Sequence, residues 1–310
     1  MMGRIYAIAI NTFREAVRDK VLYGVIAFAT VVLLFSLALA ELSLNESLRV
    51  VLDTGLASIS IFNVVVAIFL GSSLLYKEIE RKTLYVILPK PIRRWEFLVG
   101  KFFGITLTGA VFVLAMGAVQ LWVTSIQAGA SMGLVVATPV ALGVVLGLAL
   151  WKARDRTAVL VPWSLVALGA MAVLCAQTEV EILPILYMLS LYLGELLVLA
   201  AVALLFSSFS TPFLTGVFTF GVWFVGRSAD EMATMKSAAI PELVRGMLRG
   251  LSYVTPNFNL FVPGHYTLAN PDLEFGSPAL YVLSSMGYAV LYTAVILIFA
   301  AIIFRRRDFL

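Results

Sequence analysis

The segment 78–101 holds the residues with the clearest potential for chemistry, and that chemistry is recognition of another protein. Acidic side chains are followed there by basic ones, and the segment separates two long apolar runs that carry no charge. Good helix formers at 78–88, with an acidic start that suits the positive end of a helix dipole, predict a short helix ending before Pro89. Leu84 and Leu88 would give this helix an apolar patch for insertion into a groove of a partner. The alternative is a solvated basic loop that only anchors its two neighbours.

The residues after Pro91 are suited to a membrane–water interface. Arg93, Arg94 and Trp95 combine guanidinium and indole groups, which are favoured at the level of lipid headgroups. The next apolar run begins directly after them. This group therefore predicts a charged hinge between two membrane spans.

Three polar side chains lie inside apolar runs, namely Glu195, Asn63 and Gln120. An ionised carboxylate in the middle of a span costs roughly 2.5 to 3.5 kcal/mol, so Glu195 should be protonated, paired or next to water. It would line a substrate path or a subunit contact, or it would simply form a hydrogen bond with a neighbour such as Tyr192. Asn63 and Gln120 more often join helices, by hydrogen bonds of about 1 kcal/mol, than recognise a substrate.

The sequence assigns no catalytic residue and no metal site. The chain has one histidine and one cysteine, Cys175, so a disulfide within the chain is excluded. A membrane-embedded enzyme would need clustered catalytic groups near one surface, such as paired acids, and no span carries such a cluster.

The composition predicts an all-α membrane protein. The 310 residues are 61% hydrophobic and 13% charged, with a mean hydropathy of +1.00. A membrane-spanning helix needs about 20 apolar residues. The run 102–151 is about twice that length, so Gly129, Ser131 and Gly133 should mark a short turn inside it. We therefore expect one transmembrane domain over 1–310 with about eight spans, at 21–41, 54–76, 99–126, 132–151, 157–177, 182–206, 212–227 and 279–304.

The basic residues predict the orientation of the bundle. With a cytoplasmic N-terminus, most of the 22 lysines and arginines fall in cytoplasmic segments. Those that would face outward are Arg49, Arg227, Lys236, Arg245 and Arg249. The pI of 9.2 then reflects membrane topology, and no nucleic-acid partner is implied.

Two further segments are expected to be amphipathic helices. Residues 1–20 would place Tyr6, Ile10, Phe13 and Val17 on one apolar face and would lie in the inner headgroup layer, or would serve as a plain basic anchor. In the outer segment 228–278, residues 241–251 have proline in the first helical turn. The side chains expected to face the membrane or another subunit are Leu243, Met247, Leu248 and Leu251.

The order of residues in the hinge resembles the permease family of type 2 ATP-binding cassette exporters. The matching residues are Glu78, Glu80, Thr83, Leu84, Leu88, Pro91, Arg94, Gly100 and Lys101. The segment Phe206–Pro212 and the ending Phe304–Asp308 agree with the family as well. Many members have glycine where this chain has Lys82, and the usual six spans become eight, with an extra pair at 131–177.

The resemblance implies that the 77–97 hinge docks on a separate ATPase subunit. The coupling residues would be Glu78, Glu80, Arg81, Lys82, Thr83, Leu84 and Leu88, and the membrane-interface hinge would be Pro91, Arg93, Arg94, Trp95, Gly100 and Lys101. The chain has no phosphate-binding loop of the form G-x-x-x-x-G-K-[ST], so ATP and Mg²⁺ belong to the partner and this chain needs no cofactor of its own.

The resemblance also implies an assembly and an activity. Two permease copies, as a homodimer, would work with two ATPases among the lipids of a prokaryotic cell membrane and would export a substrate, in the simplest case a hydrophobic or lipid-like one. The segment 228–278 would cap the exit. The alternative is an ATP-independent secondary transporter or channel with Glu195 in its pathway, which would be expected to have several intramembrane charges.

Overall fold

The structure is a bundle of α-helices, and the residues it describes contain no β-strand. It is a computed structural model and describes residues 2–43, 45–80, 93–234, 242–269 and 277–306. In chain order the elements are α1 (Met2–Val17), α2 (Lys20–Glu41), α3 (Ser47–Glu80), α5 (Arg94–Gln127), α6 (Met132–Lys152), α7 (Leu160–Cys175), α8 (Ile182–Ser207), α9 (Pro212–Arg227), α10 (Ala229–Thr234), α11 (Glu242–Val254), the 3-10 helix η1 (Asn259–Phe261), α12 (His265–Ala269) and α13 (Pro278–Arg306).

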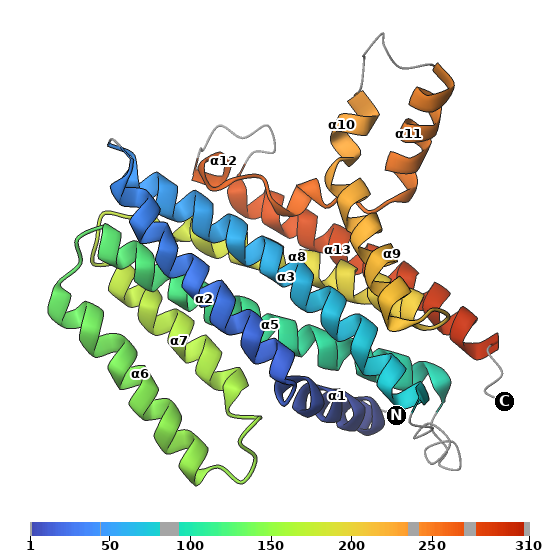
Figure 1. Cartoon of the computed structure of the whole chain (residues 1–310), viewed down its shortest axis with the longest axis horizontal. Helices are drawn as coiled ribbons and strands as arrows, with labels where there is room; N and C mark the ends of the chain where they lie inside the picture. Colours follow the sequence, from blue (N-terminus) through green and yellow to red (C-terminus); the bar gives the residue numbers. More distant parts are fainter. Residues whose placement is uncertain (1, 44, 81–92, 235–241, 270–276, 307–310) are drawn as a thin grey trace.

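Within these ranges, six helices are long and apolar enough to cross a membrane: α2, α3, α5, α6, α8 and α13. Figure 1 shows α2, α3, α5, α8 and α13 running alongside one another, with α6 at the outer edge. The central helix is α8, which packs against α3, α5, α9 and α13 and is buried along most of its length. The predicted all-α polytopic bundle is confirmed, and the chain is a multi-pass membrane protein.

The two remaining predicted spans, 157–177 and 212–227, correspond to the shorter helices α7 and α9. Each has 16 residues. A helix of this length rises roughly 24 Å, less than the ~30 Å of a bilayer core. Nevertheless α7 packs against α5 and α6, and α9 packs against α8 and α3. Both therefore belong to the bundle, although they fall short of a full span by length alone.

The helix α3 extends past the predicted span 54–76 at both ends. It begins at Ser47, because the charges that marked the outer limit pair with one another: Arg49 lies 3.1 Å from Glu46 and 3.6 Å from Asp53. It continues to Glu80 at the other end. The first residues of the predicted hinge are therefore a continuation of a membrane helix.

The long apolar run after Phe102 is divided by a tight turn at Gly129. This residue has φ +76°, a left-handed conformation that glycine adopts without steric cost and that commonly follows the end of a helix. Ala128 ends α5 and α6 starts at Met132. The turn lies within the predicted Gly129–Gly133 segment.

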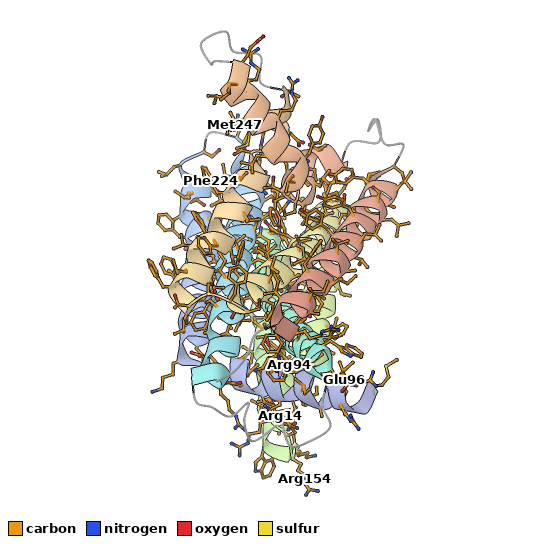
Figure 2. All side chains as sticks on the ribbon, turned by 90° about the vertical axis from the view of Figure 1, so that its right-hand side faces the viewer. Arg14, Arg94, Glu96, Arg154, Phe224 and Met247 are labelled. Carbon is orange, nitrogen blue, oxygen red and sulfur yellow. The ribbon has the colours of Figure 1, made fainter. Side chains whose placement is uncertain are left out.

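The first helix, α1, lies across one end of the bundle (Figure 2). Of its predicted apolar face, Phe13 and Val17 are buried, but Tyr6 is 68% exposed. The helix packs on α5, and its buried residues are Ala9, Thr12, Phe13, Ala16 and Val17, several of them smaller than those predicted. Packing on another helix selects small residues, whereas the sequence prediction assumed contact with lipid alone.

The helices α10 and α11 project from the end of the bundle opposite α1 (Figure 2). No residue of α11 is buried. Leu243, Met247 and Leu251 are exposed, and Leu248 is partly covered. The apolar face predicted for this helix is therefore not covered by the chain's own bundle.

Candidate functional site

The predicted coupling residues stand at the connection between α3 and α5. Glu78 and Glu80 belong to the last turn of α3. The other members, Arg81, Lys82, Thr83, Leu84, Leu88 and the hinge residue Pro91, lie outside the described residues. The geometry of the site is consequently built from the two helix ends that flank this segment.

The N-terminus of α5 is fixed by Glu96. Its carboxylate accepts a hydrogen bond from the backbone N–H of Arg93 at 3.2 Å, which satisfies a donor that the helix leaves free. The same carboxylate lies 3.8 Å from the guanidinium of Arg4 on α1, and only 4% of the Glu96 side chain is exposed. The charge also suits the positive end of the helix dipole. Glu96 therefore joins the start of α5 to α1.

Arg94 connects α5 to the end of α13. Its guanidinium donates hydrogen bonds to the carbonyl oxygens of Phe304 at 3.3 Å and Arg305 at 2.9 Å. One turn later, the ring of Phe97 stacks on that of Phe304, with centroids 6.2 Å apart. Carbonyls at a helix C-terminus lack partners inside the helix, so a cation placed there stabilises the end. Trp95 lines a groove beside α13.

Lys101 and Gly100 hold α1 against α5. The side chain of Lys101 is 1% exposed, and its Nζ lies 3.7 Å from a carboxylate oxygen of Glu15. A Cβ at Gly100 would lie 2.7 Å from the Cβ of Ile8, closer than atoms can pack, so glycine is what permits this approach. We call Arg94, Glu96, Phe97 and Lys101 the α5 junction, because they join the residues after the coupling segment to α1 and α13.

Besides the α5 junction, a cluster of polar side chains lies deep in the bundle around Glu195, which is fully buried. The indole N–H of Trp223 on α9 donates to one carboxylate oxygen at 2.9 Å, and the hydroxyl of Ser60 on α3 donates to the other at 3.3 Å. Tyr192, the partner expected from the sequence, instead donates to the carbonyl oxygen of Leu56 at 2.9 Å, because its hydroxyl reaches toward α3. Glu195 therefore ties three helices together.

Asn63 and Gln120 also connect helices. The amide of Asn63 donates to the carbonyl oxygen of Tyr192 at 3.0 Å, which joins α3 to α8. The amide of Gln120 on α5 donates to the carbonyl oxygen of Val51 on α3 at 3.2 Å and to the hydroxyl of Thr124 at 3.3 Å. These contacts have the form expected of polar ties between membrane helices.

A sequence comparison with protein families matches residues 6–309 to the family described as ABC-2 family transporter protein. The chain belongs to the ABC-2 transporter family. The match covers nearly the whole chain, so it includes both the α5 junction and the helices α6 and α7. A comparison with curated proteins found no match.

The partners that sequence reasoning missed in this ABC-2 permease are on other helices. These partners are far in sequence from the residues they contact: Arg4 and Glu15 of α1, Phe304 of α13, and Ser60 and Trp223 beside Glu195. The only available signal was indirect: a buried lysine or carboxylate requires a partner. The sequence indicated that Glu195 was unusual and that Lys101 belonged to the hinge, but it could not indicate which side chains meet them.

The ABC-2 permease also holds the α6–α7 pair to α1. Arg14 donates two hydrogen bonds to the same oxygen of Asp155, in the loop between α6 and α7, one of them from Nε at 3.0 Å. Thr157 donates to the other oxygen at 2.9 Å. The Arg14 guanidinium, followed by the Thr157 hydroxyl, lowers the pKa of Asp155 below its ordinary value. This contact connects the α6–α7 pair to the same helix that the α5 junction binds.

Proposed function

We propose that this ABC-2 permease couples ATP hydrolysis by a separate nucleotide-binding subunit to export of a substrate. The observation that carries the proposal is the connection between Glu80, where α3 ends, and Arg94, where α5 begins. Force applied to that connection acts on both helices. Through the α5 junction it also acts on α1 and α13. A docked ATPase would thus shift several spans together between two arrangements.

The distribution of charge supports a cytoplasmic location for this end of the bundle. Arg14, Arg94 and Arg154 gather there, as Figure 2 shows, together with the end of α13. Basic residues are retained on the cytoplasmic side of a membrane. Both ends of the described chain would accordingly lie in the cytoplasm of a prokaryotic cell, where an ATPase has access to ATP and Mg²⁺.

Two permeases with two ATPases, the assembly implied by the family resemblance, form the proposed working unit. The substrate we propose is hydrophobic or lipid-like. An apolar groove of about 650 Å³ between α1, α5, α8 and α13 supports this choice. Its lining includes Tyr6, Phe103, Leu197 and Met286.

Charge reversal at the coupling segment tests the proposal. The variant Glu78→Lys/Glu80→Lys, and separately Thr83→Asp/Leu84→Asp, should lose most of the ATPase that co-purifies with the wild-type permease. Reversal places a like charge or a buried polar group in the contact, which costs several kcal/mol at an interface. ATPase activity stimulated by the permease should fall in parallel.

A matched control is Glu179→Lys/Glu181→Lys, which reverses two exposed acids near the start of α8. This variant should retain the ATPase, and all variants should insert and purify normally. Full retention of the ATPase by both coupling variants would overturn the proposal. So would transport by the purified permease alone in liposomes without nucleotide, which is the result expected of a secondary transporter that uses Glu195.

A further inference from the structure

A polar groove lies between α1 and the loop that joins α6 to α7. Its volume is about 830 Å³. All its lining residues are polar or charged: Asn11, Arg14, Glu15, Arg18, Arg154 and Asp155. In Figure 2, Arg14 and Arg154 lie at the same end of the bundle.

The acidic groups of this region are all engaged by other partners. Asp155 accepts from Arg14 and Thr157, and Glu15 pairs with the buried Lys101. Asp19 accepts a hydrogen bond from the backbone N–H of Val21 at 3.1 Å and so caps α2.

Two arginines of the groove consequently keep their charge uncompensated. Arg18 and Arg154 are exposed, and neither side chain forms a hydrogen bond or an ion pair with any residue that the structure describes. Their neighbours add further positive charge. Lys20, Lys152 and Arg156 are also exposed and form no such contact within the described ranges.

We propose that this groove binds the phosphate headgroup of an anionic phospholipid from the cytoplasmic leaflet. A guanidinium donates two parallel hydrogen bonds to phosphate oxygens, so two arginines at one groove form a suitable receptor for a phosphodiester. Asn11 supplies a neutral hydrogen-bonding group in the same groove. Basic pockets beside membrane helices at the cytoplasmic surface commonly bind such headgroups.

The surroundings favour a lipid over an acidic protein surface. The groove lies beside α6, the outermost helix. Only 6% of the apolar window of α6 is buried inside the bundle. At the inner end of α6, Trp151 is 80% exposed, the placement expected of an indole at headgroup level. Above it, Val144 and Leu148 are exposed and would contact the acyl chains.

The groove is also displaced along α1 from the point where α1 meets the start of α5. The start of α5 meets α1 at Arg4, whereas the groove begins at Asn11 and extends past Arg14. Arg14 lies roughly 15 Å further along the helix axis than Arg4. Since α1 lies across the bundle, this distance separates the two positions laterally (Figure 2).

Native mass spectrometry of the detergent-purified full chain tests the site. Phosphatidylglycerol and phosphatidylcholine with the same acyl chains are titrated separately. We expect the wild type to hold phosphatidylglycerol more tightly than phosphatidylcholine. Arg18→Gln/Arg154→Gln should weaken phosphatidylglycerol binding roughly thirtyfold, the effect of removing two basic contacts at a membrane surface. Arg249→Gln, which removes an exposed arginine from α11 at the opposite end, should leave binding unchanged.

Three additional variants protect the test against misfolding. Arg18→Gln and Arg154→Gln alone should each weaken binding about fivefold. Arg18→Lys/Arg154→Lys keeps the charge but lacks the guanidinium fork, so its binding should be intermediate. Gel filtration should give the same profile for all of them.

Three results would overturn the proposal. The first is equal binding of phosphatidylglycerol by the wild type and the double glutamine variant, or no preference over phosphatidylcholine. The second is displacement of phosphatidylglycerol by millimolar inorganic phosphate, which would make a free anion the ligand. The third is loss of the co-purifying ATPase from the double variant with lipid binding unchanged, which would make the groove a protein interface.

Discussion

Lys101 of α5 lies against Glu15 of α1, with its Nζ atom 3.7 Å from a carboxylate oxygen, and 1% of the lysine side chain is exposed. The contact stands at the point where α1 crosses α5, directly after the segment proposed to bind the ATPase. It joins a helix that lies across the bundle to one that passes through it. A rotation of α5 would therefore carry α1 with it.

Removal of the Glu15 carboxylate alone should destabilise the fold more than removal of both charges of the Glu15–Lys101 pair. Glu15→Gln should lower the free energy of unfolding by about 3 kcal/mol, because the buried ammonium of Lys101 then loses the carboxylate that lies 3.7 Å from it. The double variant Glu15→Gln/Lys101→Met should recover most of that loss. Thermal unfolding in detergent measures both. The exposed pair Glu46–Arg49 supplies the control: Glu46→Gln should change stability by less than about 1 kcal/mol.

Gly104 should accept no larger side chain. A Cβ there would lie 2.4 Å from the Cβ of Thr12 and 2.7 Å from the carbonyl oxygen of Ala9, and a backbone atom cannot move aside cheaply. Gly104→Ala should therefore destabilise the α1–α5 packing by about 1 to 3 kcal/mol and reduce ATPase stimulation. Gly143→Ala on α6, where nothing lies within 4 Å, should have no such effect. Equal melting temperatures for the two variants would contradict the prediction.

Glu195 should be replaceable by glutamine but not by leucine. Glutamine still has an oxygen to accept the hydrogen bond from Trp223, so Glu195→Gln should keep the helices together and preserve transport. Glu195→Leu leaves the indole N–H buried without an acceptor, which costs about 1 to 3 kcal/mol. Transport and thermal stability of both variants in liposomes would be compared. Abolished transport in a stable Glu195→Gln variant would show that the carboxylate acts on the substrate path.

The contact between Arg14 and Asp155 should persist as the solution is acidified to about pH 3.8. The pKa of Asp155 is lowered from its ordinary 3.8 by the Arg14 guanidinium, so its contribution to stability is fully present above that value. As the pH falls through the lowered pKa, the carboxylate becomes protonated and the contribution is lost. Spin labels on α1 and on the α6–α7 loop should report a constant distance from neutral pH to pH 3.8 and separation only below it. Asp155→Asn should show the separated distance at every pH.

The sequence by itself determined where the chain crosses the membrane. A lipid-embedded helix must satisfy its own backbone and exclude charge over about 20 residues, and this requirement is visible in one dimension. The predicted segments 132–151 and 182–206 accordingly coincide with α6 and α8 to within about one residue at each end. The ABC-2 resemblance likewise depends on the order of residues along the chain, and the family match confirms the family.

The tertiary structure alone decided which faces of these helices meet. Helices in a membrane are apolar on every side, because the lipid is as apolar as the packed interior, so their sequences carry little information about which face is buried. Which faces meet decides three features of this fold: the buried face of α1, the pair Lys101–Glu15, and the hydrogen bonds from Ser60 and Trp223 to Glu195.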